Sequence, residues 1–320
     1  MKLKMMYSFL NNDIQIIEDE LVATIQSERE LLQEASLHLL QAGGKRIRPV
    51  FVLLAAKFGD YNIQKIKNVA VALELIHMAS LVHDDVIDDA ELRRGKPTIK
   101  SKWNNRIAMY TGDYIFARSL ELMTSVENIH AHRILSRTIV ELCRGEIEQI
   151  RDKYNFDQNL RTYLLRIKRK TAILIAVSCQ LGAISANVPE HIHKSLYWFG
   201  YYVGMSFQIT DDILDFTSTE KELGKPAGSD LLQGNITLPV LFAMENPVIN
   251  SKIRQISEQS TPDDIQYLIK EIKESDAITR SFALSDRYLQ KAFKELDKLP
   301  NGIAKKTFNN VAKYIGKRKY

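Results

Sequence analysis

The stretch VALELIHMASLVHDDVIDDAELRR, residues 71–94, changes abruptly from apolar side chains to four aspartates and two arginines. Apolar residues fill most positions from Val71 to Val82, which predicts a helix that is buried on nearly all sides. Asp84 and Asp88 lie four residues apart, so a helix places both carboxylates on one face, where like charges repel. The C-terminal end of a helix also disfavours anions. The sequence therefore predicts that a cationic group compensates these carboxylates.

Composition favours an all-α protein. The chain has 320 residues, of which 45% are hydrophobic and 26% charged, and a net charge of +5, as in ordinary globular proteins. Its 14 glycines and 8 prolines make up about 7% of the chain, against roughly 12% in average usage, so helix-breaking residues are scarce. The longest uncharged stretch, residues 171–189, contains several polar side chains, which indicates a buried core helix rather than a membrane span.

Apolar residues recur at spacings of three and four between turn signals, which predicts roughly ten or more helices. No linker or low-complexity tract divides the chain, so we expect a single domain over residues 1–320. The predicted helix breaks lie near Gly43–Gly44, Gly59–Asp60, Gly95–Pro97, Asn155–Gln158, Val188–Pro189, Gly224–Gly234, Asn246–Pro247, Thr261–Pro262 and Pro300–Gly302.

The acidic pattern occurs twice. DDVID at residues 84–88 recurs as DDILD at residues 211–215, 127 positions later, again at the end of an apolar segment. One such cluster, partly neutralised by Arg93 and Arg94, is readily explained as a solvated helix end, but two clusters of the same D-D-x-x-D form are not. Carboxylate oxygens favour hard cations, and Mg²⁺ is usually held by one or two carboxylates together with phosphate oxygens. The repeat therefore predicts a clamp for a metal-bound diphosphate.

Several basic and polar residues accompany the two clusters. QAGGKRIRP, residues 41–49, is a glycine-containing turn that lacks the P-loop pattern but carries cations suited to phosphate. His77 lies two helical turns before Asp84, and Gln208 lies three residues before Asp211, each on the same face as its cluster. Taken singly, the turn is also explained as a basic surface loop and the histidine as a core residue.

Together these motifs resemble the trans-polyprenyl diphosphate synthases. The resemblance runs in order along nearly the whole chain, through GGKRIRP, LELIHMASLVHDD, DDVIDDAELRRGKPT, GDYIFARSL, KTAIL, GMSFQITDDILDF and GKPAGSDL. It implies the isoprenoid synthase type of helical bundle around a central cavity. Within the family, the chain is most similar to the catalytic subunits of two-component heptaprenyl diphosphate synthases.

The resemblance assigns roles residue by residue. It implies that Mg²⁺ is the cofactor and is held by Asp84, Asp88, Asp211 and Asp215. It implies contact with the allylic diphosphate or its reacting carbon for Arg93, Lys170, Thr171, Gln208 and Lys225. It implies that isopentenyl diphosphate is bound by Lys45, Arg48, His77 and Arg94.

The implied reaction is head-to-tail condensation of isopentenyl diphosphate onto an allylic diphosphate such as farnesyl diphosphate. The expected product is all-trans heptaprenyl diphosphate for a menaquinone side chain, with hexaprenyl or another medium or long chain as the alternative. The resemblance also implies a smaller component I subunit as a hetero-oligomeric partner, no nucleic acid partner, and peripheral membrane contact for product release.

Product length is expected to depend on the residues just before the first cluster. Short-chain members of the family have bulky aromatic residues four and five positions before the first aspartate. Here those positions are Ser80 and Ala79. Their small side chains predict an open slot and a long product.

Three other functions are disfavoured by the sequence. A terpene cyclase needs Ser or Thr, then Glu, at positions where this chain has Asp215 and Thr219. A di-iron carboxylate protein needs Glu-x-x-His motifs in buried helices, and of the three here only Glu74/His77 meets that condition. A non-catalytic subunit would lose the aspartate motifs that this chain keeps.

The cysteines and the N-terminus indicate a cytoplasmic protein. Cys143 and Cys179 show no disulfide or metal spacing, so we interpret them as packed free thiols in a reducing compartment. The first residues turn polar at Asn11, which supports neither a signal peptide nor an anchor.

Overall fold

The computed structural model describes residues 2–218 and 227–316, and most of them are helical. The chain divides into two compact units. Unit 1 comprises Met1–Leu135, Val177–Tyr197 and Pro300–Thr307, and unit 2 comprises Ser136–Ala176, Trp198–Leu299 and Phe308–Tyr320. Four of the boundaries between them fall within α8 (Ile129–Arg151), α10 (Ile173–Ser185), α11 (Glu190–Thr217) and α18 (Ile303–Gly316), and the fifth lies between Leu299 and Pro300, just before α18. The expected all-α class is confirmed, whereas the single domain over residues 1–320 stays a prediction.

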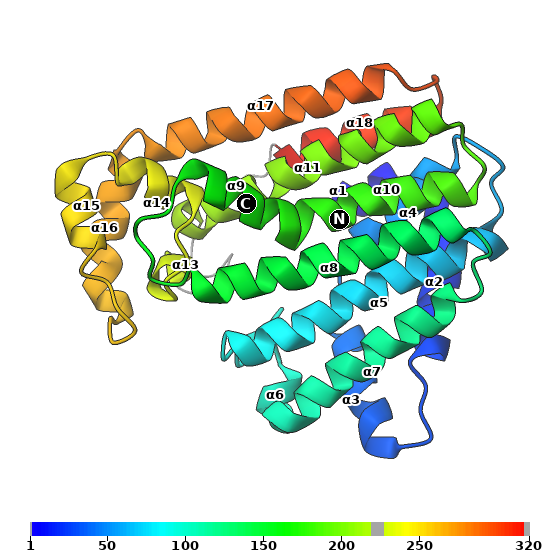
Figure 1. Ribbon diagram of the computed structural model, residues 1–320, viewed down its shortest axis with the longest axis horizontal. Helices are drawn as coiled ribbons and strands as arrows, with labels where there is room; N and C mark the ends of the chain where they lie inside the picture. The colour runs from blue at the N-terminus through cyan, green and yellow to red at the C-terminus, as the bar shows by residue number, and fades with distance from the viewer. Residues whose placement is uncertain (1, 219–226, 317–320) are drawn as a thin grey trace. The chain divides into compact units, whose positions relative to one another are not determined.

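Unit 1 packs around α5 (Ile63–Ile87), which runs beside α7 (Figure 1). Asn62 caps α5 by accepting a hydrogen bond from the backbone amide of Gln64 at 2.9 Å. Every residue from Val69 to Ile76 is buried, which confirms the predicted buried helix. Unit 1 also contains α1 (Lys2–Met6), η1 (Ser8–Leu10), α2 (Asn11–Thr24), α3 (Glu30–Gln41), α4 (Ile47–Ala56), α6 (Ile99–Lys102) and α7 (Asn105–Met123).

A short hairpin follows α5 and was not anticipated from the sequence. Strands β1 (Leu92–Arg93) and β2 (Lys96–Pro97) pair antiparallel. Arg94 and Gly95 between them have φ angles of 54° and 76°. A type I′ turn requires positive φ at both central residues, and its twist matches that of the strands. The predicted break at this glycine is therefore a tight hairpin that holds two adjacent arginines.

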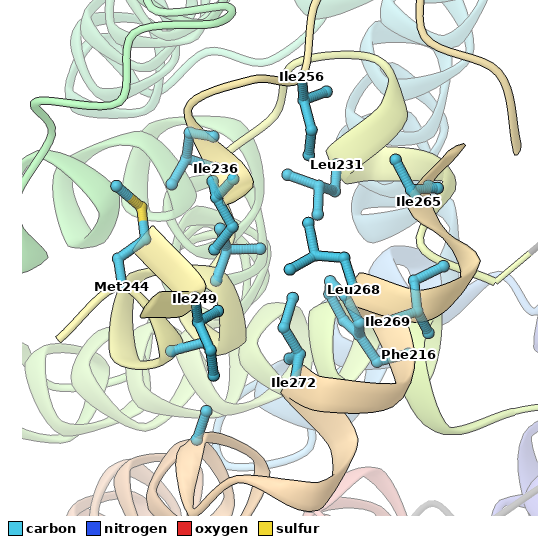
Figure 2. Packing of buried hydrophobic residues seen from close by; sticks show 14 residues of the cluster. Phe216, Leu231, Ile236, Met244, Ile249, Ile256, Ile265, Leu268, Ile269 and Ile272 are labelled. Atoms are coloured by element: carbon cyan, nitrogen blue, oxygen red, sulfur yellow. The ribbon is translucent and has the colours of Figure 1, made fainter. Parts of the chain in front are cut away.

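Unit 2 contains α9 (Leu160–Ile167), the π-helical segment η2 (Lys168–Ala172), α13 (Ser229–Leu232), α14 (Leu238–Ala243), α15 (Pro247–Ile253), α16 (Pro262–Glu274) and α17 (Ala277–Asp297). One of its apolar clusters is drawn in Figure 2, where Leu231, Ile265 and Leu268 converge near Phe216 at the end of α11. Each fully buried side chain of this size contributes about 2 kcal/mol by leaving water. This packing supports the C-terminal end of α11, where the second aspartate cluster lies.

The uncharged stretch of the sequence forms α10, and its residues Ile173–Val177 are all buried. The predicted core helix is thus confirmed. In the part of the chain that the structure describes, no helix has the length and apolar character needed to cross a membrane. Cys179 is buried as expected, but Cys143 is exposed on α8, so the expectation that both thiols are packed was wrong for Cys143.

Candidate active site

The first aspartate cluster lies in the last turn of α5. The backbone amide of Asp88 donates to the carbonyl oxygen of Asp84 at 2.8 Å, so helical geometry extends across both residues. Asp84 and Asp88 are half-buried, whereas Asp85 is only 3% exposed. Helical spacing therefore keeps the two outer carboxylates on one face and turns Asp85 toward the interior.

Asp85 serves as the anchor of Arg93. The guanidinium donates from Nε to Oδ1 of Asp85 at 2.8 Å, and its Nη2 lies 2.7 Å from the same oxygen. Burial raises the pKa of Asp85, and the hydrogen bond and charge of Arg93 oppose that rise. A buried carboxylate of this kind stabilises a single arginine geometry, because its desolvation is compensated only while the pair is intact. The hairpin thereby presents Arg93 beside the first cluster.

A buried lysine fixes the segment between α5 and the hairpin. Lys100, on α6, forms ion pairs with Asp89 and with Glu91, the latter at 3.1 Å. Asp89 has a φ angle of 51°, a left-handed conformation that aspartate tolerates better than most residues. The chain therefore reverses immediately after the cluster, which brings the arginines back to the end of α5.

A concentration of positive charge lies within unit 1. A Cβ atom on Gly44 would lie 2.8 Å from Nη1 of Arg94 and 3.1 Å from Nη1 of Arg46, so both guanidiniums approach this glycine. Burial lowers the pKa of Arg48 to about 10, an effect that Glu74 opposes and the charge of Arg94 enhances. Burial also holds the pKa of His77 well below its usual value, and the charges of Arg48 and Arg94 depress it further. The imidazole is thus neutral beside several cations.

One buried carboxylate offsets part of this charge. Glu74, 4% exposed on α5, accepts from Nη1 of Arg46 at 3.2 Å. Arg46 also forms a two-pronged pair with Glu18, at 2.6 and 3.1 Å. Arg48 differs, since its buried Nε has no hydrogen-bond partner among the described residues. Arg46 is therefore held by protein carboxylates, whereas the buried Nε of Arg48 is not.

The residues expected to set product length lie on the same helix. Ala79 is 1% exposed, and Ser80 is half-buried and donates its hydroxyl to the carbonyl oxygen of His77 at 2.8 Å. Ser80 thus carries the more accessible of the two small side chains. Their influence on product length stays a prediction.

The second cluster ends α11 in unit 2. Asp211 is half-buried and Asp215 is 2% exposed. The carboxylate of Asp215 accepts from the Ser229 hydroxyl at 3.0 Å and from the backbone amide of Asp230 at 3.2 Å. Its backbone carbonyl also accepts from the amide of Gly228 at 2.8 Å. Asp215 therefore anchors the start of α13 in addition to any role toward a ligand.

Asp212, between these two, lies in a buried polar network. It accepts from the hydroxyl of Tyr163 at 2.7 Å and from the amide nitrogen of Gln208 at 2.9 Å, and Gln208 in turn accepts from Thr171 at 2.6 Å. Burial raises the pKa of Asp212 to about 7, as does the charge of Asp230, and its two hydrogen bonds oppose the rise. The network joins α9, η2 and α11.

Lys170 and Thr171 lie in the π-helical turn η2, a form that often marks functional positions within α-helices. The amine of Lys170 donates to the side-chain oxygen of Gln149 at 2.8 Å. Lys225, the other lysine expected near the allylic diphosphate, lies outside the described residues. Lys45 is exposed and follows Gly44 directly.

The predicted metal ligands have suitable chemistry for Mg²⁺. Within residues 2–218 and 227–316, no three His, Cys, Asp or Glu side chains gather into a metal site of their own. Mg²⁺ does not need such a cage, because it usually takes one or two carboxylates and completes its shell with water and phosphate oxygens. The paired carboxylates of Asp84 and Asp88 supply that kind of incomplete, all-oxygen set.

The structure brings some of the residues that the sequence singled out together within each unit. Arg48, His77 and Arg94 share one charged region, and Thr171 is hydrogen-bonded to Gln208. Sequence reasoning missed the supporting residues Glu74, Lys100, Tyr163 and Asp212. The sequence does carry a signal for Asp212, since both DDxxD motifs have a second aspartate at the same position. The structure shows that this second aspartate, Asp85 in the first motif and Asp212 in the second, is buried in both.

Comparisons with known proteins agree on one family. The family described as Polyprenyl synthetase matches residues 29–272. Heptaprenyl diphosphate synthase component 2 of Bacillus subtilis is 68% identical over 320 residues, 100% of this chain and 92% of that protein. The crystal structure of heptaprenyl diphosphate synthase from Staphylococcus aureus matches with a TM-score of 0.94 and 46% identity, over 97% of this chain and 98% of that chain.

A polyprenyl synthase from Caulobacter crescentus, crystallised with calcium and isoprenyl diphosphate, matches with a TM-score of 0.94 and 30% identity. The match covers 99% of this chain and 98% of that chain. By sequence and by fold, this chain belongs to the polyprenyl synthetase family.

Proposed function

We propose that this chain is the catalytic component of a heptaprenyl diphosphate synthase, which condenses isopentenyl diphosphate onto an allylic diphosphate, with farnesyl diphosphate as the expected primer. The observation that carries the proposal is the arrangement at the end of α5. There the half-buried Asp84 and Asp88 lie at the C-terminal end of the helix that carries His77, and the positive charges of nearby arginines lower the pKa of that buried imidazole. Carboxylates for a metal-bound diphosphate and cations for a second diphosphate are what a two-diphosphate condensation needs.

Mg²⁺ is the proposed cofactor, with Asp84, Asp88, Asp211 and Asp215 as its protein ligands. When bound, the metal supplies Lewis-acid stabilisation of the negative charge on the departing diphosphate. The Caulobacter crescentus relative was crystallised with a divalent cation and isoprenyl diphosphate, which supports this assignment. The carboxylate chemistry of the four residues supports it independently.

The remaining residues divide between two substrates. Arg93, Lys170 and Lys225 bind the allylic diphosphate, and the oxygens of Thr171 and Gln208 stabilise the allylic carbon as its C–O bond breaks and positive charge develops. Lys45, Arg48, His77 and Arg94 hold isopentenyl diphosphate. The isopentenyl double bond then attacks the allylic cation, and a proton leaves to an oxygen of the diphosphate released in the first step. No covalent enzyme nucleophile is needed.

A second subunit completes the proposal. The Bacillus subtilis relative is named as component 2, and we infer a smaller component 1 partner for this chain as well. We also propose a cytoplasmic location and no nucleic acid partner, since unpaired cysteines suit a reducing compartment and the charged region is explained by diphosphates.

The direct test incubates the purified chain with farnesyl diphosphate, labelled isopentenyl diphosphate and Mg²⁺, with and without the Bacillus subtilis component 1 protein. The expected result is heptaprenyl diphosphate, formed much faster with the partner. Full activity of the chain alone would contradict the two-component proposal. A hexaprenyl or longer product would correct the chain length, and no product under any condition would refute the catalytic assignment.

Filling the slot before the first cluster is expected to shorten the product. Ser80→Phe should lower the main product by about one to three isoprene units, because an aromatic ring occupies space that the growing chain needs. Ala79→Phe with Ser80→Phe should shorten it further. Chromatography of the dephosphorylated products measures the length, and Ser80→Thr is the matched control with little added volume. An unchanged product from the double variant would refute the slot.

Gly44→Ala is expected to raise KM for isopentenyl diphosphate by about tenfold, or ~1.4 kcal/mol of binding. The new Cβ would lie 2.8 Å from Nη1 of Arg94, so this guanidinium must move. Steady-state kinetics with each substrate varied in turn makes the measurement, and KM for the allylic substrate should stay within about twofold. Gly302→Ala is the control, since nothing lies within 4 Å of its added Cβ. Equal effects on both substrates would contradict the assignment.

A further inference from the structure

The buried network around Asp212 contains an ordered set of donors and acceptors. Asp212 accepts from Tyr163 through Oδ2 and from the side-chain nitrogen of Gln208 through Oδ1. The oxygen of Gln208 accepts from the hydroxyl of Thr171. Asp212 is 4% exposed and Tyr163 is fully buried, so the protein rather than solvent supplies these partners.

These contacts decide which end of the Gln208 amide faces Thr171. A glutamine side chain has a donor end and an acceptor end of nearly equal size, and only its partners fix their orientation. Asp212 accepts at both of its oxygens, from Tyr163 at Oδ2 and from the Gln208 nitrogen at Oδ1, so this nitrogen faces Asp212. Its oxygen is thereby turned toward Thr171, and this oxygen has two lone pairs, of which Thr171 uses one.

We propose that Asp212 is a positioning residue, whose carboxylate holds the Gln208 amide so that its oxygen, and not its nitrogen, faces the allylic carbon as that carbon becomes cationic. This inference rests on the proposed function. An oxygen dipole aimed at developing positive charge lowers the barrier, whereas an amide nitrogen at the same place raises it. Tyr163 keeps the carboxylate oriented by donating to its other oxygen.

The equivalent aspartate of the first cluster supports an inward-facing role. Asp85 is also buried, and its carboxylate binds Arg93 within the protein. In both motifs, the second aspartate therefore orients another side chain that the proposal places at the allylic substrate. The first aspartate of each motif, Asp84 or Asp211, is more exposed than the second.

The test reverses the polarity of the contact. In Asp212→Asn the side-chain oxygen accepts from Tyr163, so its nitrogen faces Gln208 and forces that amide to turn round. The expected result is a fall in kcat of about 100-fold, with KM for both substrates within about threefold. Affinity for an ammonium analogue of the allylic substrate, relative to an uncharged thiodiphosphate analogue, should fall by about tenfold.

Restoring the acceptor identifies the cause. In the double variant Asp212→Asn with Gln208→Glu, the new glutamate accepts a hydrogen bond from the amide nitrogen of the new asparagine. Its other oxygen again faces Thr171. The kcat of the double variant should therefore be about tenfold higher than that of Asp212→Asn. Gln208→Glu alone places two carboxylates together and should be slower than the double variant. Asp85→Asn is the matched control, and Gln208→Glu should not rescue it.

Two results overturn the inference. One is a kcat of Asp212→Asn within about threefold of the wild type, and the other is a double variant that does not exceed Gln208→Glu by about tenfold. The comparison of the double variant with Gln208→Glu can still be made if Asp212→Asn alone does not fold. The polyprenyl product made by the wild-type chain with its partner subunit is measured first, and this measurement separates the two proposals. If the wild type makes no product, the proposed function is refuted. If it makes the product but one of the two results above is obtained, only the role of Asp212 is refuted.

Discussion

Asp84→Asn and Asp211→Asn are each expected to lower kcat for chain elongation by about 10³-fold, equivalent to ~4 kcal/mol of transition-state stabilisation. Each substitution removes one negative charge from the proposed Mg²⁺ ligands and leaves the side-chain volume unchanged. Both aspartates are half-buried, so the free energy of unfolding should change little. The loss should therefore appear in the chemistry and in the dependence on metal, not in folding.

A magnesium titration measures this effect directly. Chelation with EDTA should abolish wild-type activity, and added Mg²⁺ should restore it. Both variants should need about tenfold more Mg²⁺ for half-maximal activity, because a carboxylate ligand has been lost. Asp89→Asn is the matched control, since Asp89 is exposed, asparagine also tolerates its positive φ angle, and Lys100 keeps its ion pair with Glu91. An equally severe loss in Asp89→Asn, or normal metal dependence in Asp84→Asn, would contradict the assignment.

Helix identity was predictable from the sequence, and helix ends were predictable where glycine or proline marks them. The predicted breaks near Gly43, Gly59, Pro189 and Pro262 all separate helices in the structure. Glycine and proline gave no signal for the starts of α7 and α8. Asparagine marks both starts, since Asn104 accepts from the amide of Ile107, and Asn128 from that of His130. Side-chain capping fixes these ends without any breaker residue.

The site was predictable only as far as local spacing reaches. Four-residue spacing and the repeat predict Asp84, Asp88, Asp211 and Asp215 as candidate ligands, because helical periodicity links the two positions within each pair directly. The partners of the second aspartates were not predictable, since Tyr163 is 49 residues from Asp212 and the contact depends on packing. The same holds for Glu74 and Arg46, which are 28 residues apart.

Glu74→Gln is expected to lower the free energy of unfolding by about 3 kcal/mol, because Arg46 loses its buried partner and keeps only the more exposed Glu18. The side chains of Arg46 and Glu74 are only 9% and 5% exposed. Arg48 and Arg94 lie in the same field, and the charge of Glu74 stabilises the protonated form of both. Urea unfolding followed by circular dichroism measures the loss.

Glu18→Gln is the matched control, because Glu18 pairs with the same Arg46 but its side chain is 32% exposed. Water screens an exposed pair, so this variant should lose about 1 kcal/mol or less. Equal losses in the two variants would show that pairing with Arg46, rather than the buried charge of Glu74, decides stability.

Inorganic pyrophosphate should then distinguish a charge effect from a packing effect. If Glu74 is the counter-charge of a diphosphate site, its loss leaves excess positive charge that a bound anion compensates. Pyrophosphate at about 100 times its dissociation constant stabilises a protein that binds it only when folded by ~2.7 kcal/mol. The gain should be larger in Glu74→Gln than in the wild type at equal concentration, because the variant binds the anion more tightly. A cavity or a lost hydrogen bond would not respond to pyrophosphate in this way, so an equal gain in both proteins would place Glu74 outside the electrostatics of the site.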